Sequence, residues 1–414
     1  MRLSSLRVEN IGPFDLAEVV FQAEDDRDPS VTLLTGKNGT GKTILLDAIR
    51  ASFGRGYAKL ERQLWRKDTP FVVKLRHSFH ATEGVGVTEL LSTRLQADFP
   101  FAPGDSALFQ LPADIKNGPV RPPPWVVDFW RSQLAMDPFQ IQSLAAVDHR
   151  ALYWGALQGI ATNASVTHLL CHFDYLRDSR DAREKATGEA LYQLAEKIIQ
   201  FSLLDGRLVG IERLSFTPIV RQSGHEVPLG NISSGNAYLV QRMISLLGRM
   251  YSLHVLRGSD PSTIHQAPGL LLIDEAENHL HPEWQKRFLP GVRDIFPNLQ
   301  IIAATHSPFV LASVPEARVY VCHYDPSTQR TTVREETAAY QNKPIDEILL
   351  SPAFDETPPF NEEISGLMAT RRAAIKAGDT AVREQVERKL VALNPTYFGY
   401  LDIEQKLAAL RKAG

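Results

Sequence analysis

Gly36-Lys37-Asn38-Gly39-Thr40-Gly41-Lys42-Thr43 is the stretch that decides the fold of this chain. It fits G-x-x-x-x-G-K-[ST], and its context is that of a phosphate-binding loop, because an apolar strand is expected over 31–35 and a helix over 44–52. Such a loop brings backbone N–H groups to a phosphate at a helix N-terminus. Lys42 is expected to bridge the β- and γ-phosphates, and Thr43 to ligate Mg²⁺. The residues expected to bind ATP are therefore Gly36, Asn38, Gly39, Thr40, Gly41, Lys42 and Thr43; the alternative is a glycine-rich turn that matches by chance.

A buried strand that ends in two carboxylates follows much later in the chain. Leu270–Glu275 has the sequence LLLIDE, and a strand buried on both faces exposes charge only at its C-terminal tip, where α/β sheets bind ligands. Asp274 is expected to hold Mg²⁺, and Glu275 to polarise the attacking water, since hydrolysis needs a base in line with the γ-phosphate. Alone, such a pair is often only a solvated strand end. Its position after a complete phosphate loop favours the functional interpretation.

Two shorter signals complete the set. Gln300–Pro308, QIIAATHSP, is another buried strand, and it leads to His306, which can contact the γ-phosphate and orient water. The segment 231–236, NISSGN, opens a helix whose N-terminus suits a phosphate, through Ser233, Ser234 and Gly235. Taken alone, these are a satisfied histidine and an ordinary capping serine. One monomer has little use for a second phosphate site, so we expect the second one to close over ATP bound to another copy of the chain.

Composition excludes several classes of protein. The 414 residues carry 45 Lys and Arg against 48 Asp and Glu, and this net charge of −3 argues against binding a polyanion through global charge. The two cysteines, Cys171 and Cys322, lie far apart, so neither a disulfide framework nor a zinc site is expected. No apolar run approaches the ~18 residues of a membrane span, and the N-terminus lacks the apolar region of a signal peptide. We therefore expect a cytoplasmic protein with no membrane partner.

The pattern along the chain indicates an α/β protein in four segments. These are an N-terminal ATPase segment with the phosphate loop (1–56), an insert (57–205), a C-terminal ATPase segment (206–340) and a helical tail (341–414). Strands are expected over 2–9, 17–21, 71–77, 85–95, 209–220, 226–229, 269–273, 300–305, 318–323 and 331–335. Helices are expected over 181–203, 235–251, 361–376, 380–393 and 401–412. Apolar stripes of the tail helices are interpreted as core packing, with a partner surface as the alternative.

Taken in order, these elements resemble the ATP-binding-cassette (ABC) ATPases of the RecF/SMC/OLD-like branch. GKNGTGKT resembles the Walker A motif, ISSGN the LSGGQ-type signature, LLLIDEAENHLHP the Walker B motif and D-loop, ATHSP the switch-histidine segment and LSSLRVENIGPF the first hairpin. The resemblance implies a P-loop NTPase fold of ABC type, a mixed sheet flanked by helices, with an α+β insert and a C-terminal helical tail. Ile232 and Asn236 depart from the usual signature, and His281 stands where transporters carry an aspartate. Gln140 and Gln142 are candidates for the Q-loop glutamine.

The resemblance also implies partners. ABC-type heads form a head-to-tail homodimer, or a higher homo-oligomer, around two ATP molecules with Mg²⁺. The catalytic side of one subunit would then face the signature of the other. The catalytic side comprises Lys42, Thr43, Asp274, Glu275 and His306, and the signature comprises Ser233, Ser234 and Gly235. OLD nucleases of this branch carry a D-x-D motif in an appended TOPRIM domain, and no such motif follows residue 320 here. The chain is most similar to ATPase subunits of Septu-type and retron-linked anti-phage systems, which pair with a separate HNH or TOPRIM nuclease.

Three functions compete on this evidence. The first is an ATPase whose ATP-driven dimerisation controls a separate effector nuclease in anti-phage defence. The second is a RecF-like ATPase that binds DNA in repair or recombination, with a basic run as a candidate contact, although most such runs are solvated surface. That run comprises Arg55, Lys59, Arg62, Arg66 and Lys67. The third is a scaffold with degenerate ATP sites, against which the intact Lys42, Asp274, Glu275 and His306 argue.

Overall fold

The chain divides into two compact units, Met1–Ile345 and Asp346–Gly414. The computed structural model describes residues 1–22, 30–53, 70–78, 86–91, 122–132, 137–157, 165–203, 205–354 and 360–401. The basic run between Arg55 and Lys67 lies outside these residues, as does the helix expected over 401–412 except for Leu401.

The first unit is organised around a six-stranded sheet of order β13-β12-β3-β11-β10-β6. Its strands are β3 (Val31–Gly36), β6 (Val126–Trp130), β10 (Gly269–Ile273), β11 (Leu299–Ala304), β12 (Arg318–Asp325) and β13 (Arg330–Glu335). All neighbours are parallel except β12 and β13, which form a hairpin. Every residue of β3, β6, β10 and β11 is buried, because helices and loops cover both faces. The continuous apolar sequences of β10 and β11 predict this burial.

A second, antiparallel sheet has the order β2-β1-β4-β5. It is built from β1 (Arg2–Ile11), β2 (Phe14–Val20), β4 (Val72–Ser78) and β5 (Gly86–Leu91). Burial alternates along β4, with Val73, Leu75 and His77 inside, which is the period expected when one face packs on a core. The opening hairpin predicted from the sequence is thus confirmed, and residues of the predicted insert extend its sheet.

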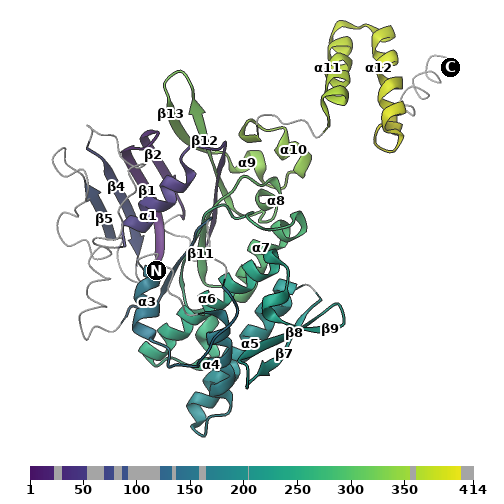
Figure 1. Cartoon of the computed structure of the whole chain (residues 1–414). Coiled ribbons are helices and arrows are strands. Elements are labelled where there is room, and N and C mark those ends of the chain that lie inside the picture. The colour runs from purple at the N-terminus through teal and green to yellow at the C-terminus, as the bar shows by residue number, and fades with distance from the viewer. Residues whose placement is uncertain are drawn as a thin grey trace. The chain divides into compact units, whose positions relative to one another are not determined.

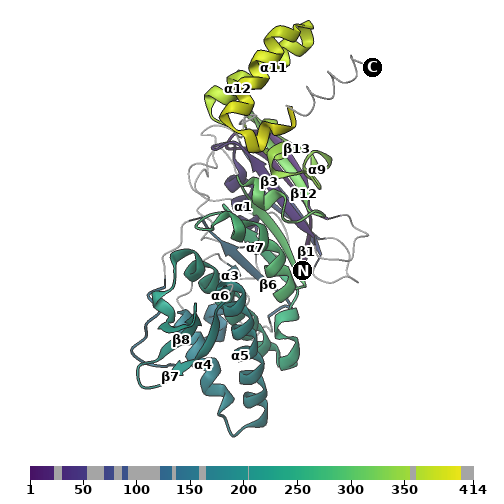
Figure 2. The ribbon, with the colours of Figure 1, turned by 90° about the vertical axis from the view of Figure 1, so that its right-hand side faces the viewer.

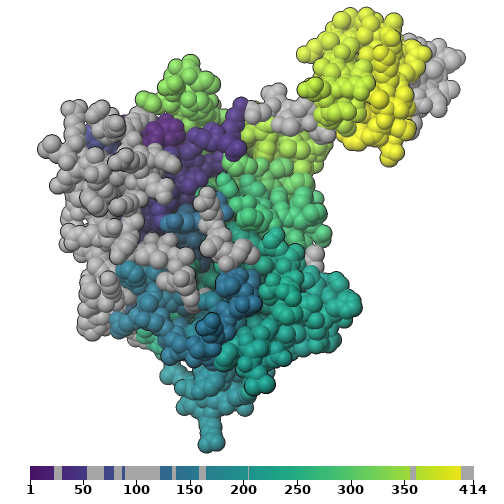
Figure 3. Space-filling view, in the orientation of Figure 1, coloured from purple at the N-terminus to yellow at the C-terminus, as the bar shows by residue number. Residues whose placement is uncertain are grey.

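Helices α3 (His149–Leu157), α4 (Val166–Arg177), α5 (Ala182–Leu203) and α6 (Ser234–Arg257) pack together beside the small sheet β7-β8-β9. In both ribbon views α4, α5, β7 and β8 lie at one end of the first unit, away from β12 and β13 (Figures 1 and 2). The turn between α4 and α5 protrudes at that end in the space-filling view (Figure 3). The remaining helices of this unit are α1 (Lys42–Ala51), η2 (Leu229–Asn231), η3 (Pro261–Gln266), α7 (Pro282–Ile295), α8 (Pro308–Leu311) and α9 (Thr337–Tyr340).

One expectation about strands was wrong, and one strand was missed. The single strand predicted over 209–220 is a hairpin of β7 (Arg207–Glu212) and β8 (Thr217–Gln222), followed by β9 (His225–Pro228). The chain turns because Phe216 adopts a positive φ of 52° and the Arg213 guanidinium pairs with Asp174 and Asp178 near the end of α4. Strand β6 was not predicted at all, since a five-residue segment after three prolines has too short a pattern to distinguish it from a loop.

The second unit is helical. It contains α10 (Ile345–Leu349), which begins at the unit boundary, η4 (Pro352–Phe354), α11 (Glu362–Ala377) and α12 (Thr380–Leu393). Helices α11 and α12 lie side by side around a small core of Val386, Leu390, Phe398 and Leu401 (Figure 1). The buried Glu387 accepts hydrogen bonds from Arg371 at 2.7 Å and Arg383 at 3.0 Å, so its charge is compensated. The two helices predicted over 361–376 and 380–393 are confirmed, with core packing as their role in this unit.

Candidate functional site: a phosphate loop at the carboxyl end of the sheet

The phosphate loop runs from the end of β3 into α1. Gly41 is the N-cap of α1 and has a φ of 99°, a conformation that disfavours any residue with a Cβ. A Cβ at this position would also approach the Phe14 ring to 2.7 Å. Glycine is therefore required both by the turn and by the packing of the loop on the opening hairpin. The first turn of α1 directs unpaired N–H groups into the loop, as anion binding needs.

Lys42 is folded back onto this loop. Its ammonium donates to the carbonyl oxygens of Gly36 at 3.0 Å and Lys37 at 2.9 Å, and the residue is buried. Burial lowers the pKa of Lys42, and the nearby Asp274 and Glu275 carboxylates counteract this effect. The two carbonyl oxygens thus hold the Lys42 ammonium at the place where phosphate oxygens of a bound nucleotide would accept its hydrogen bonds instead. This position suits the predicted role of Lys42 at the β- and γ-phosphates.

Thr43 and Asp274 come together across 231 residues of sequence. The Thr43 hydroxyl donates to Asp274 Oδ1 at 2.9 Å. Burial raises the pKa of Asp274, while hydrogen bonds from Thr43 and Ser132 and the charge of Lys42 favour the ionised carboxylate. A hydroxyl and a carboxylate at this distance are the hard oxygen ligands that Mg²⁺ prefers. The two residues therefore fit the predicted metal site, and Ser132 is a neighbour that sequence reasoning missed.

Glu275 occupies the tip of the Walker B strand in a strained conformation. Its φ is 51°, whereas the preceding strand residues are extended, and its side chain is exposed next to Asp274. Positive φ at a non-glycine residue costs free energy and is typical of functional positions. The turn separates the two carboxylates, so that Asp274 is directed to Thr43 while Glu275 faces solvent. A water molecule can therefore reach Glu275, as a general base requires.

His306 lies near the phosphate loop, and burial and the charge of Lys42 lower its pKa to about 4. A hydrogen bond with the Gly36 backbone partly opposes that shift. The imidazole is consequently neutral at neutral pH and can donate or accept one hydrogen bond without adding charge. The structure thus brings Lys42, Thr43, Asp274 and His306 to one edge of the sheet, with Glu275 beside them.

A clamp between the Walker B loop and the histidine segment was not predicted from the sequence. The Glu277 carboxylate accepts from the Thr305 hydroxyl at 2.6 Å and from the His306 backbone N–H at 2.7 Å. The Ala276 N–H donates to the Ala304 carbonyl at 2.9 Å, which extends the connection to β11. One carboxylate oxygen of Glu277 thus fixes the backbone of His306, and the other fixes the side chain of the preceding Thr305. The only signal in the sequence was its place two residues after Glu275.

The signature residues form an exposed helix start. Ser233 is the N-cap of α6 and accepts from the Asn236 N–H at 3.4 Å, and Ser233 and Ser234 are both exposed. A Cβ on Gly235 would approach the His279 carbonyl oxygen to 2.7 Å, so glycine permits close packing of the signature on its own D-loop. No hydrogen bond within the described chain joins these residues to the phosphate loop. Their exposure leaves them accessible to another molecule.

The signature helix is tied to β6 by a buried ion pair. Arg249 of α6 pairs with Asp128 of β6, and Trp130 Nε1 donates to the same carboxylate at 3.0 Å. Burial lowers the pKa of Arg249 to about 10. Asp274 N–H donates to the Trp130 carbonyl at 2.8 Å, so β6 also touches the Walker B aspartate. The Q-loop candidates Gln140 and Gln142 are exposed, and Gln133, outside the described residues, directly follows Ser132 in the sequence.

Two family models match parts of this chain. A family described as "AAA domain, putative AbiEii toxin, Type IV TA system" matches residues 141–312, and a family described as "AAA domain" matches residues 5–83. A solved SMC head bound to the C-terminal winged-helix domain of ScpA superposes with a TM-score of 0.52 at 13% identity, over 81% of this chain and 98% of that one. At that identity the likeness shows the fold, and it confirms the predicted P-loop ATPase architecture.

Curated relatives include the Retron Vc95 probable ATPase of Vibrio cholerae, 28% identical over 43% of this chain and 34% of the relative. The Septu protein PtuA of Bacillus thuringiensis is 26% identical over 46% of each chain. The chain therefore spans less than half of the length of these relatives. The resemblance to ABC-type ATPases of this branch is confirmed by these matches together with the motifs. Among the described residues, no helix combines the length and apolarity that a membrane span demands.

Proposed function

We propose that this chain binds and hydrolyses Mg²⁺-ATP at the phosphate loop. The observation that carries the proposal is the 2.9 Å hydrogen bond between Thr43 and Asp274, because it joins the Walker A and Walker B motifs as one set of oxygen ligands. Lys42 would leave the carbonyls of Gly36 and Lys37 for the β- and γ-phosphate oxygens. When bound to Thr43 and Asp274, Mg²⁺ would supply neutralisation of phosphate charge.

Glu275 would accept a proton from the attacking water, and the neutral His306 would hydrogen-bond a γ-phosphate oxygen or that water. Glu277 positions His306 through its backbone and does not touch the substrate. The contribution of each group is orientation and charge stabilisation, which is what phosphoryl transfer requires.

The proposal extends to a head-to-tail dimer in which Ser233, Ser234 and Gly235 of one copy close over ATP bound to the other. It is supported by the exposure of the signature and by its separation from the phosphate loop of its own chain. ATP binding would then hold the dimer together and hydrolysis would release it, because the ligand favours the closed state only while the γ-phosphate is present.

Complementation tests the dimer directly. Lys42→Ala and Ser233→Arg variants should each be inactive alone. When mixed, a mixed dimer has one site with both defects and one intact site, so roughly a quarter of wild-type ATPase activity should return. Ser215→Arg, an exposed serine in the β7–β8 turn, is the matched control and should remain active. No recovery in the mixture, with both variants folded, would show that the signature does not act on another copy.

We further propose that the ATPase cycle controls a separate effector nuclease in anti-phage defence, with the nuclease of HNH or TOPRIM type. The similarity to the Septu and retron ATPase proteins supports this role. Purification of the tagged chain with its neighbouring gene products, followed by nuclease assays with and without ATP, tests it. A co-purified nuclease whose activity depends on Glu275 would support control by the ATPase; recovery of the chain with DNA and recombination factors would instead favour a repair role.

A further inference from the structure

A cavity of about 390 Å³ lies among α3, α4, α5 and α6, formed by residues that the ATP site does not use. Its volume is within the range of small-molecule sites. Valine, leucine and alanine line it together with polar and aromatic side chains, which include His149, His172, Arg183, Glu184, Tyr251 and His254. Such a concentration of ionisable groups in a single hollow is unusual for helix packing alone, since charged groups are normally dispersed over the surface.

One side of the cavity is cationic. Arg183 forms no ion pair with any described carboxylate, and a Cβ added to Gly258 would lie 3.3 Å from its guanidinium. His254 is close to Arg183, which together with burial lowers the pKa of the imidazole. His254 Nδ1 lies 3.0 Å from the Ser259 hydroxyl, so Nε2 is the ring nitrogen left for a ligand. A guanidinium without an ion pair in the described chain, with a histidine nitrogen beside it, is the recognition chemistry of a phosphate or carboxylate.

The other side is aromatic and offers acceptors. His149 and Tyr251 meet edge to face at 4.9 Å, and His172 Nε2 lies 2.9 Å from the Tyr251 hydroxyl. The Ser252 hydroxyl donates to the Gly248 carbonyl, so the contact of Ser252 with His149 at 3.3 Å must use the N–H of His149 Nδ1. His149 Nε2 is therefore the acceptor of the neutral ring, and no hydrogen bond within the described chain occupies it.

Glu184 adds a second acceptor at this aromatic side. One of its carboxylate oxygens accepts from the Ser179 hydroxyl at 2.6 Å, and no hydrogen bond within the described chain occupies the other. The charge of Glu184 raises the pKa of both His172 and Tyr251, so this carboxylate lies near the aromatic side chains of the cavity. A ligand that fits would place an anionic group beside Arg183 and a flat ring with N–H donors beside Tyr251, His149 and Glu184.

We propose that this cavity binds a nucleotide, with its phosphate beside Arg183 and His254. The base would lie against Tyr251 and His149, and its N–H groups would face Glu184. Nucleobases stack on tyrosine and histidine rings, and base amino groups donate to carboxylates. The nucleotide is either a free mononucleotide or the terminal nucleotide of a strand, since both present the same base and phosphate.

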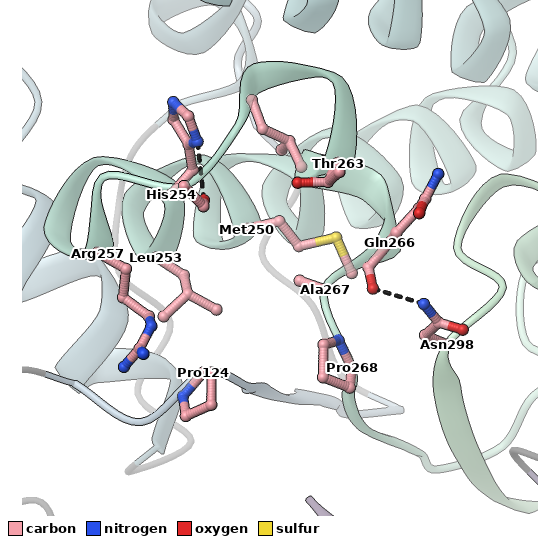
Figure 4. Close-up of a pocket in the computed structure, with 12 residues that line it drawn as sticks. Pro124, Met250, Leu253, His254, Arg257, Thr263, Gln266, Ala267, Pro268 and Asn298 are labelled. Carbon is pink, nitrogen blue, oxygen red and sulfur yellow. Dashed lines mark hydrogen bonds between the residues drawn. The ribbon is translucent and has the colours of Figure 1, made fainter. Parts of the chain in front are cut away.

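A neighbouring cavity of about 240 Å³ is less suited to a nucleotide than the first one. It also lies at the C-terminal turns of α6 and shares His254 with the first cavity, and it is lined by Pro124, Met250, Leu253 and Pro268 (Figure 4). Its polar groups are engaged within the chain, since Asn298 donates to the Gln266 carbonyl at 2.6 Å and Arg257 donates to the Pro122 carbonyl. The His254 ring is directed away from Pro124 and Arg257 in this view.

The location of the proposed site gives it a route to the ATP site. Helix α6 has 24 residues, so it is about 36 Å long, and it begins at Ser234, directly after the capping residue Ser233. A nucleotide held by α3, α5 and α6 would stabilise one arrangement of these helices and hence one position of the signature. This effect on the signature rests on the proposed function, whereas nucleotide binding in the cavity does not. If the two sites are coupled, ATP must change the affinity of the cavity as much as the nucleotide changes the affinity for ATP.

Equilibrium dialysis with radiolabelled 5′-mononucleotides tests the proposal on the full chain. The Lys42→Ala background removes competition from the phosphate loop. We expect one equivalent of at least one of the four mononucleotides to bind, and Arg183→Ala to weaken binding by roughly ten- to hundredfold. Lys185→Ala, an exposed cation on the same helix that does not line the cavity, is the matched control and should not change binding.

Ala146→Trp provides a second variant, because Ala146 is an exposed lining residue and a tryptophan there would fill the cavity without removing a charge. It should abolish binding. A 5′-phosphorylated oligonucleotide that binds more tightly than the mononucleotide, with the same dependence on Arg183, would identify a strand end as the source. The proposal is overturned if no mononucleotide or oligonucleotide binds, if inorganic phosphate binds equally well, or if binding survives both Arg183→Ala and Ala146→Trp. If the unmodified chain shows no ATPase activity but the cavity still binds the mononucleotide, that result would count against the proposed function and not against the cavity site.

Discussion

Glu277 is the residue whose replacement tests the reasoning about this site most sharply. Its two carboxylate oxygens accept from the Thr305 hydroxyl at 2.6 Å and the His306 N–H at 2.7 Å. Each hydrogen bond to an ionised group contributes about 1.5–3 kcal/mol, so Glu277→Ala removes up to about 3–6 kcal/mol. Both bonds are only partly buried, and water would recover a share of that. We therefore take about 3 kcal/mol as the free energy by which Glu277 holds His306 in its position.

That value predicts a fall in kcat of roughly two orders of magnitude for Glu277→Ala, since each 1.36 kcal/mol is a factor of ten. Glu277→Gln retains one acceptor oxygen and should lose about tenfold by the same relation. Nucleotide affinity, measured with a fluorescent ATP analogue, should stay within about twofold, because Glu277 positions His306 and does not itself bind phosphate.

Two variants control this experiment. Glu283→Ala removes an exposed carboxylate from the nearby α7 and should leave turnover unchanged. Thr305→Val removes one of the two donors and should fall between wild type and Glu277→Ala. Turnover of Glu277→Ala within about threefold of wild type, with the protein folded, would refute the positioning role. Equal loss of ATP affinity and turnover would show that Glu277 instead supports the binding loop.

Three further predictions follow from other parts of the first unit. Glu275→Gln should retain ATP binding, lose turnover and accumulate a dimer in size-exclusion chromatography with light scattering; unchanged turnover would remove Glu275 from the mechanism. Burial lowers the pKa of His77 to about 4, so the folded state favours the neutral ring; its stabilising contribution is complete above pH 6.5 and is lost as the pH falls toward 4. Urea unfolding at pH 7 and pH 5 should show this loss, and His77→Leu should reduce the pH dependence, whatever it does to stability at pH 7. Arg249→Met should destabilise the fold by roughly 3–5 kcal/mol, because it leaves the Asp128 carboxylate buried without its partner. Adding Asp128→Leu should restore much of the lost stability, which urea unfolding measures. Equal stability of the single and double variants would contradict this account of the ion pair.

Much of the ATP site was accessible from the sequence because its signals are local. A phosphate loop needs glycines and a lysine at fixed spacing between a strand and a helix, and each part lies within a dozen residues. The strands β10 and β11 are recognisable because strands covered on both faces must be continuously apolar. Parallel strands place their carboxyl ends at one edge of a sheet, so Asp274 and His306 could be assigned to the edge that carries Lys42.

Other features depended on contacts between distant segments. Strand β6 is too short for its pattern to be distinctive, yet its pairing with β10 brings Ser132 to Asp274. The role of Glu277 depends on the distance between two loops, which no spacing along the chain encodes. Likewise, Arg183 and Tyr251 lie on separate helices and look like ordinary surface and core residues in the sequence. Their cavity exists only because α3, α4, α5 and α6 pack together.

Short-range patterns of glycine, charge and apolar residues are therefore enough to identify the chemistry of the ATP site and the class of fold. The side chains that hold those groups in place, and the second polar cavity, can be identified only in the folded chain. The physical reason is that hydrogen bonds and ion pairs act over a few ångströms in space, and the chain brings such partners together only when it folds.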